Sequence, residues 1–212
     1  MREFQLLTIA ECHAHIAPVV DAALGPQGIV NVRPMLWVNS SAAPIRRIFE
    51  YWQLGSGLSP RWGYSFDAVP HLAGGKPKWH RTEKSALLDA FVDGQGAEHN
   101  LSYIGGVDGL LTGMPEKVHA AIAQAQAFWQ AAPTPARVFA QVIEMAEGSK
   151  QRPMQLALHM AAAMCHAFAG REEQGRKELA LFISRGKAKE EAVPKLMDIF
   201  EGWLRDGYRA GA

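Results

Sequence analysis

The sequence predicts an α+β protein in which an N-terminal helix packs on an antiparallel sheet, followed by a C-terminal helical bundle with an αα-hairpin. Three changes of pattern indicate this fold. Apolar residues recur at helical spacing over 3–24, residues 29–105 show alternating and β-branched runs, and the pattern after Gly113 is helical. At 212 residues, 48% hydrophobic and 20% charged, the chain has an ordinary globular composition and enough length to bury a sizeable core.

Residues 3–24 are expected to form the first helix, which Gly25 and Pro26 end. On a helical wheel, one stripe of this segment would face the core, and it contains Leu6, Ile9, Ala10, His13, Ile16, Ala17, Val20 and Leu24. Pro18 falls in the same stretch, and proline removes a helical hydrogen bond. We therefore expect the helix to kink or to split near Ala17.

Residues 29–105 are expected to supply the strands. The segment 29–40 is rich in β-branched residues, and Pro34 within it marks an edge or a break. Two alternating runs, 45–54 and 59–71, flank a short Gly-containing connector, which predicts a hairpin. On one side of its second strand lie three rings that we assign to the core, under the first helix: Trp62, Tyr64 and Phe66.

Two further segments, 86–94 and 101–106, could add strands, although 86–94 could equally form a short helix. After Gly113, prolines at the starts of periodic segments favour helices at about 115–131, 135–147, 153–169, 172–185 and 194–206. Gly170 and Arg171 join the third and fourth of these into the αα-hairpin. We expect an α+β portion over 1–113 and a helical portion over 114–212, packed as one body.

Composition limits the classes of partner. The formal net charge of +1 gives no overall attraction to nucleic acid or to anionic lipid. Two cysteines, Cys12 and Cys165, are too few for a disulfide framework, so a reducing compartment is expected. No stretch has the ~18 apolar residues of a membrane span, and the N-terminus lacks the apolar core of a signal peptide. We expect a soluble protein of a bacterial-type cytoplasm.

Motifs for catalysis are weak, and we predict no catalytic residue, cofactor or metal. Glu11, Cys12 and His15 lie within one helical turn, but a zinc site needs about four ligands and no second ligand pair occurs. We expect them to form a solvent-facing helix flank instead. Cys12, Cys165 and Ser56 lack the setting of a nucleophile. The Gly-rich segment 103–113 lacks a phosphate-binding spacing, so its glycines are assigned to a turn.

Charge is segregated along the sheet segment. Residues 31–84 contain eight Lys or Arg and three Asp or Glu, whereas residues 85–116 contain five acidic residues and no Lys or Arg. Four of the six tryptophans lie in the basic segment. A basic, aromatic surface suits nucleic acid, and it suits a protein partner equally well. Alternatively, the rings are core and the charges pair with the acidic segment.

The segment after Pro70 is the most suggestive one, because Trp79, His80 and Arg81 flank a Gly-containing turn in an expected loop. The hypothesis is a non-catalytic protein that binds another protein, of the inhibitor or immunity type that masks a toxin or an enzyme. The alternatives are nucleic-acid binding through 31–84 and an enzyme with a pocket at His71 and His80. The predicted partner-binding residues are Arg46, Arg47, Arg61, His71, Lys78, Trp79, His80 and Arg81.

Overall fold

The structure, a computed structural model, describes residues 7–39, 44–55, 57–79, 82–94, 96, 98–148 and 155–207. Contacts between Cα atoms group the chain into two compact units, each assembled from three stretches. The first unit comprises Met1–Ala42, Arg46–Tyr64 and Phe91–Ala131, and the second comprises Ala43–Ile45, Ser65–Ala90 and Ala132–Ala212. An α+β fold with an antiparallel sheet and C-terminal helices is confirmed.

Helix α1 (Ile9–Leu24) opens the described part of the first unit. Its start is fixed by a capping box, in which the Thr8 side chain accepts from the Glu11 amide and the Glu11 carboxylate accepts from the Thr8 amide. Residues 3–6 of the predicted helix lie outside the described residues. The helix passes through Pro18 unbroken, so the predicted split does not occur.

The buried face of α1 contains Ile16, Val20 and Leu24 of the predicted stripe and, in addition, Cys12. Cys12, Ile16, Val20 and Leu24 are fully buried at a spacing of four residues. The placement of Cys12 on a solvent-facing flank was therefore wrong. His13, which was expected in the core stripe, is only half-buried. A free cysteine packs as a small apolar side chain, which explains its place in the core.

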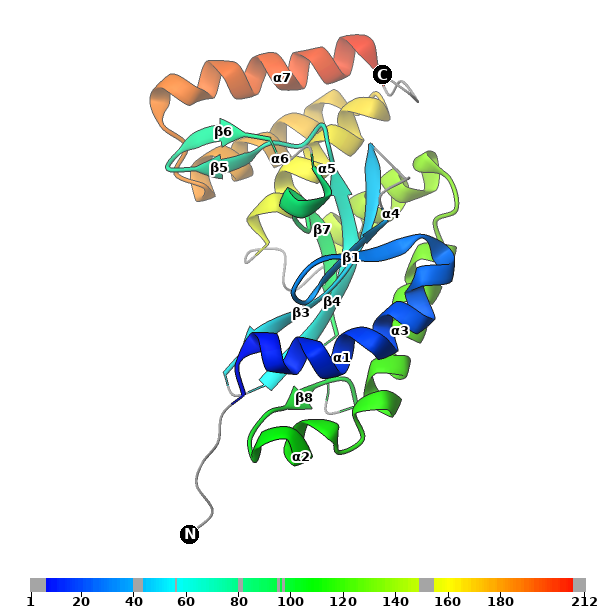
Figure 1. Cartoon of the computed structure of the whole chain (residues 1–212). Helices are drawn as coiled ribbons and strands as arrows, with labels where there is room; N and C mark the ends of the chain where they lie inside the picture. Colours follow the sequence, from blue (N-terminus) through cyan, green and yellow to red (C-terminus); the bar gives the residue numbers. More distant parts are fainter. Residues whose placement is uncertain are drawn as a thin grey trace. The chain divides into compact units, whose positions relative to one another are not determined.

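The sheet has the strand order β1-β2-β3-β4-β7, with β8 paired to β4 (Figure 1). The strands are β1 (Ile29–Arg33), β2 (Leu36–Asn39), β3 (Ile45–Leu54), β4 (Gly57–Phe66), β7 (Ala90–Asp93) and β8 (Leu101–Ser102). The predicted β3–β4 hairpin is confirmed. Of the ambiguous segment 86–94, Ala90–Asp93 form a strand, β7. β1 and β2 join through a tight turn in which Met35 adopts a φ of 64°.

Two helices complete the first unit, α2 (Gly106–Leu111) and α3 (Met114–Gln130). Helix α1 packs against β1 and α3, and Figure 1 shows α1 and α3 side by side. Trp37 is fully buried, and its indole N–H donates to Asp21 of α1 at 2.7 Å. Tyr64 meets the ring of Phe128 on α3, with 5.3 Å between centroids.

The assignment of Trp62, Tyr64 and Phe66 to the core is confirmed, because each of them is at most 3% exposed. Trp62 meets the ring of His99 edge-on, and Tyr64 contacts Phe128 of α3. That α1 covers these three rings stays a prediction. Burial raises the pKa of Tyr64 to about 12, although the positive charge of Arg47 acts in the opposite direction.

The second unit contains four longer helices: α4 (Pro135–Gly148), α5 (Leu156–Phe168), α6 (Glu172–Arg185) and α7 (Val193–Asp206). Helix α5 packs against the other three and is buried on nearly every side. The αα-hairpin of α5 and α6 is confirmed, and Gly170, with a φ of 68°, lies in its turn. Pro153, predicted to begin α5, lies outside the described residues.

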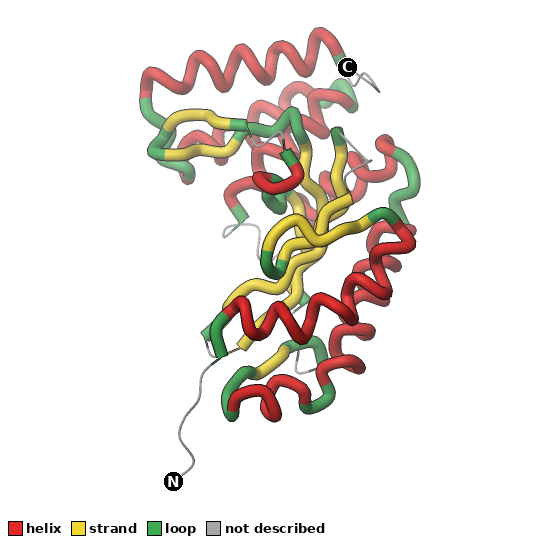
Figure 2. Tube along the Cα trace, in the orientation of Figure 1, coloured by secondary structure: helices red, strands yellow, loops and turns green. Residues whose placement is uncertain are grey.

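A short hairpin belongs to the second unit where a loop was predicted. β5 (His71–Ala73) pairs antiparallel with β6 (Lys76–Lys78) across Gly74 and Gly75, both at positive φ. The Lys189 amide donates to the Gly75 carbonyl at 3.1 Å, which ties the turn to the α6–α7 connection (Figure 2). The loop prediction was therefore wrong for Lys76–Lys78, a strand too short to show alternation, whereas Trp79 lies outside any strand.

Candidate functional site

Arg61, one of the predicted partner-binding residues, is engaged within the first unit. Its guanidinium carbon lies 3.3 Å from the ring centroid of Trp52, and its Nε lies 2.8 Å from an Asp93 carboxylate oxygen. Glu50 adds a longer contact at 3.6 Å. Burial raises the pKa of Glu50, and the charge of Arg61 opposes that shift. The Arg61–Asp93 pair joins the basic and the acidic segments internally.

The other predicted residues fall into separate groups. Arg46 is buried and Arg47 is half-buried, both on β3 of the first unit. In the second unit, His71 lies opposite Lys78 in the β5–β6 hairpin. Trp79 follows directly and has the Lys195 ammonium 5.2 Å from its ring centroid. His80 and Arg81 lie outside the described residues.

The possible metal ligands near the N-terminus serve the helix. Glu11 is bound to Thr8 in the capping box, and those hydrogen bonds lower the pKa of Glu11. His13 Nδ1 accepts from the Met35 amide at 3.4 Å. Within the described ranges, no three His, Cys, Asp or Glu residues are grouped to hold a metal ion. The same ranges contain no helix with the length and apolarity of a membrane span.

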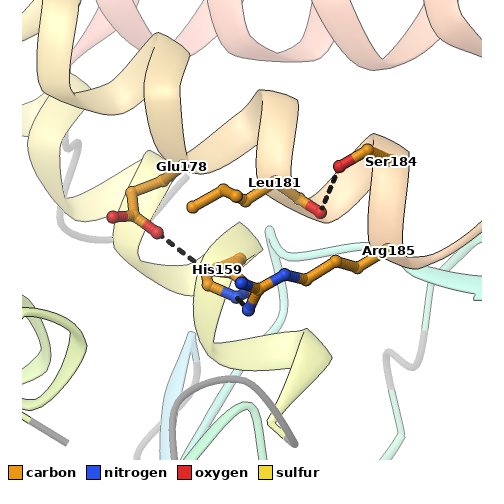
Figure 3. A network of polar contacts seen from close by, with 5 residues as sticks. All are labelled: His159, Glu178, Leu181, Ser184 and Arg185. Atoms are coloured by element: carbon orange, nitrogen blue, oxygen red, sulfur yellow. Dashed lines mark hydrogen bonds and ion pairs between the residues drawn. The ribbon is translucent and has the colours of Figure 1, made fainter.

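A polar network around a buried histidine joins α5 and α6, and the sequence analysis did not predict it (Figure 3). His159 is fully buried; its Nδ1 lies 2.8 Å from a Glu178 carboxylate oxygen, and its Nε2 lies 2.9 Å from an Arg185 nitrogen. An arginine can only donate, so Nε2 accepts and Nδ1 carries the proton given to Glu178. The imidazole thus links Glu178 and Arg185 of α6 to α5.

The second unit contains a cavity of about 310 Å³, which we call the aromatic pocket. Its volume is at the lower end of the range of small-ligand sites, ~300–1,000 Å³. Four of its walls are aromatic rings, and most of the others are apolar. The pocket is lined by Pro44, Ile45, Phe66, Ala68, Phe139, Met164, Phe168, Trp203, Asp206 and Gly207.

Helix ends position the walls of the aromatic pocket. Phe168 is the last residue of α5, and Asp206 is the last residue of α7, where Gly207 ends the helix at a φ of 63°. Phe168 lies 5.4 Å from Phe139 and 6.5 Å from Trp203 between ring centroids, at interplanar angles of 50° and 67°. The three rings therefore form inclined walls instead of a closed stack.

Among the described residues that line the aromatic pocket, Asp206 is the single ionisable one. A second cavity, of about 240 Å³, lies in the first unit beside the β1–β2 turn, where Arg33 and Glu50 are among its lining residues. Comparison of the chain with family models, with curated proteins and with solved structures finds no match.

The sequence could not indicate the aromatic pocket, because its lining residues come from two distant parts of the chain, Pro44 to Ala68 and Phe139 to Gly207. Phe66 was predicted to be a core ring, and it is buried. Its ring is also one of the walls of the aromatic pocket. Phe139, Phe168 and Trp203 each fit an ordinary apolar helix position. Only their convergence at the ends of α5 and α7 makes a site.

Proposed function

We propose that this chain is a non-catalytic binding protein that receives a side chain of a partner protein in the aromatic pocket. The role that fits this geometry is that of an inhibitor or immunity-type protein, which masks the surface of a toxin or an enzyme. The observation that carries the proposal is the open cavity of about 310 Å³ walled by four aromatic rings in the second unit.

An aromatic-walled recess is a suitable hot spot for protein recognition. Interfaces draw most of their affinity from a few anchors that fill well-packed pockets. Burial of one large apolar side chain contributes about 1.5–3 kcal/mol, so a single anchor can dominate a modest interface. Water in such a recess has few polar partners, since the lining offers mainly carbon atoms. Its displacement by a side chain is therefore favourable.

The cysteines support a cytoplasmic location for this binding role. Cys12 and Cys165 are both free and both buried. Burial raises the pKa of each thiol, so the reactive thiolate is disfavoured. Two unpaired thiols held in apolar cores are compatible with a reducing compartment.

A peptide-display selection tests the proposed function. Random peptides are selected on the wild-type protein and then compared on Ala68→Phe, which places a ring in the aromatic pocket without deleting any wall. The matched control is Ala180→Phe, at an exposed position of α6 outside the lining. Unfolding transitions of all three proteins confirm that each variant is folded.

We expect a family of selected peptides that binds the wild type and Ala180→Phe alike and loses at least about tenfold in affinity on Ala68→Phe, the loss of one anchor. If no selected peptide distinguishes Ala68→Phe from the wild type, the aromatic pocket is not a recognition site and the proposal is wrong.

A further inference from the structure

The cavity of about 240 Å³ in the first unit, which we call the sheet cavity, has two opposite charges in its lining, Arg33 and Glu50. We propose that the sheet cavity binds a free α-amino acid, whose carboxylate pairs with Arg33 and whose ammonium pairs with Glu50. Its volume is below the ~300–1,000 Å³ of sites for drug-sized ligands, as suits a small molecule. The sheet cavity shares no lining residue with the aromatic pocket, so the two sites can be tested independently.

Strand pairing places the two charges on the same face of the sheet. Arg33 of β1 lies opposite Leu36 of β2, and Leu36 lies opposite Glu50 of β3. Directly paired residues of neighbouring strands project to the same face, so the three side chains form one row. Because strands are ~4.8 Å apart, the Cα atoms of Arg33 and Glu50 are separated by about 10 Å. The buried Leu36 lies between them and gives the cavity an apolar floor.

The two charges attract each other without forming an ion pair. The charge of Arg33 acts to lower the pKa of Glu50, so Arg33 lies within electrostatic reach of that carboxyl. Arg33 is exposed, and its guanidinium makes no ion pair or hydrogen bond in the described part of the chain. Every lining residue of the sheet cavity, with its two chain neighbours on either side, lies in the described ranges. A ligand with a carboxylate and an ammonium can therefore fill the gap between these two side chains.

Glu50 already has Arg61 as a partner within the sheet and keeps it in the proposed complex. Arg61 approaches Glu50 Oε1 at 3.6 Å and an Asp93 oxygen at 2.8 Å, so one guanidinium faces two carboxylates. Burial raises the pKa of Glu50, the two arginines lower it and Asp93 raises it, and the net shift is upward. The charge of Glu50 is thus incompletely compensated by its surroundings. An ammonium between Glu50 and Arg33 adds to this compensation without displacing Arg61.

A zwitterion fits the sheet cavity better than an ion of one sign. A simple anion at Arg33 would lie near the Glu50 carboxylate, and a simple cation at Glu50 would lie near the Arg33 guanidinium. Like charges placed together are unfavourable, whereas each end of an amino acid faces the opposite charge. The lining also includes Met35, Leu36 and Trp52, which favour an amino acid with an apolar side chain.

Four probes with the same side chain test this site in an NMR titration of the ¹⁵N-labelled full chain. L-leucine has both charges, leucine amide has only the ammonium, N-acetyl-leucine has only the carboxylate, and N-acetyl-leucine amide has neither. Trp52 lines the sheet cavity, so its indole N–H is the reporter, and the signal is assigned by its loss in Trp52→Phe.

Two variants each replace one charge of the sheet cavity by an uncharged amide, Arg33→Gln and Glu50→Gln. The matched controls carry the same substitutions at exposed positions of α4, Arg137→Gln and Glu144→Gln. Urea denaturation of each protein confirms that it is folded. The comparison of the four probes on the wild type needs no variant, so it remains decisive even if Glu50→Gln does not fold.

We expect leucine to shift the Trp52 signal and to bind about fivefold more tightly than leucine amide or N-acetyl-leucine, because each lost ion pair is partly exposed. In Arg33→Gln, the advantage of leucine over leucine amide should disappear. In Glu50→Gln, the advantage of leucine over N-acetyl-leucine should disappear. Arg137→Gln and Glu144→Gln should behave as the wild type.

Three results would overturn the amino-acid ligand. The first is that no probe shifts the Trp52 signal at its highest soluble concentration. The second is that leucine binds the wild type no more tightly than either analogue with a single charge. The third is that the preference for leucine survives unchanged in Arg33→Gln and Glu50→Gln. None of these results concerns the aromatic pocket, whose function is tested separately with Ala68→Phe.

Discussion

The buried carboxyl of Asp89 joins the two ends of the segment Ser65–Ala90 in the second unit. Its Oδ2 accepts a hydrogen bond from the Phe66 amide at 2.7 Å, and the residue is only 6% exposed. Burial raises the pKa of Asp89 well above its usual value, and the hydrogen bond from Phe66 opposes the shift without cancelling it. Such a group makes stability depend on pH.

The direction of that dependence follows from proton binding. Between the unfolded pKa near 3.8 and the raised folded pKa, the folded state holds a proton that the unfolded state has lost. The contribution of Asp89 to stability is therefore fully present below the unfolded pKa, and it is lost as the pH rises through the folded pKa.

We predict that Asp89→Asn removes this loss, because an asparagine carbonyl can still accept from Phe66 and carries no proton to lose. Relative to the wild type, the unfolding free energy of the variant should increase steadily from pH 4 to pH 8, as measured by urea denaturation. Asp198→Asn, at an exposed site, serves as the control and should show no such trend. A difference between Asp89→Asn and the wild type that is constant over this range would contradict the raised pKa.

At the residue scale, the sequence indicated the core better than the site. The rings of Trp62, Tyr64 and Phe66 are buried as predicted, because alternation in a strand reports directly on the buried face. Cys12 was misplaced because it was counted as a possible ligand and not as an apolar residue. The engagement of Arg61 by Trp52 and Asp93 could not be predicted, since a basic residue has the same pattern whether it is paired or free.

At the scale of elements, proline and periodicity predicted the C-terminal helices closely. The helices expected at 135–147 and 172–185 are observed at Pro135–Gly148 and Glu172–Arg185. The start of α1 was placed too early, although Thr8 and Glu11 have the spacing of a capping box and carried the correct signal. Gly74 and Gly75 likewise carried a hairpin signal. Helix α2 has only six residues, too few for a helical period.

A glycine pair allows the packing of the helices to be tested. A Cβ on Gly175 of α6 would lie 2.7 Å from the Phe200 ring of α7 and 3.2 Å from the Ala163 carbonyl oxygen of α5. A Cβ on Gly202 of α7 would meet only Arg205, at 3.9 Å. Each substitution to alanine favours the helix by ~1 kcal/mol through its propensity. The difference in unfolding free energy between the two variants therefore measures the cost of the contact between a Cβ at position 175 and its neighbours.

We predict that Gly175→Ala lowers the unfolding free energy by about 1–2 kcal/mol, because overpacking of a core exceeds the gain in propensity. Gly202→Ala should raise it by up to ~1 kcal/mol. Chemical denaturation of both variants measures the two effects. If the two substitutions stabilise the protein equally, then α6 does not approach Phe200 as closely as the structure shows.

At the scale of the whole molecule, neither of the two compact units is one continuous stretch of the chain. Prediction placed a boundary at 113/114, where the pattern turns helical, and this boundary stays a prediction. Contacts group residues 65–90 with 132–212 and group α3 with the first unit. Composition and linkers along a chain can reveal only contiguous domains. The interleaving, and the aromatic pocket that it assembles, therefore have no signal in the sequence.

Because residues 65–90 and 132–212 form one compact unit, we predict that the C-terminal helices need residues 65–90 in order to pack. Residues 65–90 supply the second unit with the buried side chains of Phe66, Val69, Ala86 and Ala90. Without them, a fragment 132–212 exposes the apolar faces that they cover. We expect this fragment to retain helical far-UV circular dichroism and to lose near-UV signal, dispersed NMR resonances and cooperative unfolding, as a state without fixed packing does.

A second fragment supplies the matched control for that experiment. When residues 65–90 are joined to 132–212 through a flexible Gly/Ser linker, the buried side chains return, and dispersed resonances with a cooperative transition should return with them. The selected peptides of the proposed function can then be applied to this fragment, because it contains most of the residues that line the aromatic pocket. If the fragment 132–212 alone unfolds cooperatively, segment 65–90 is not part of its core. The contact grouping would then have to be replaced by a boundary near residue 132.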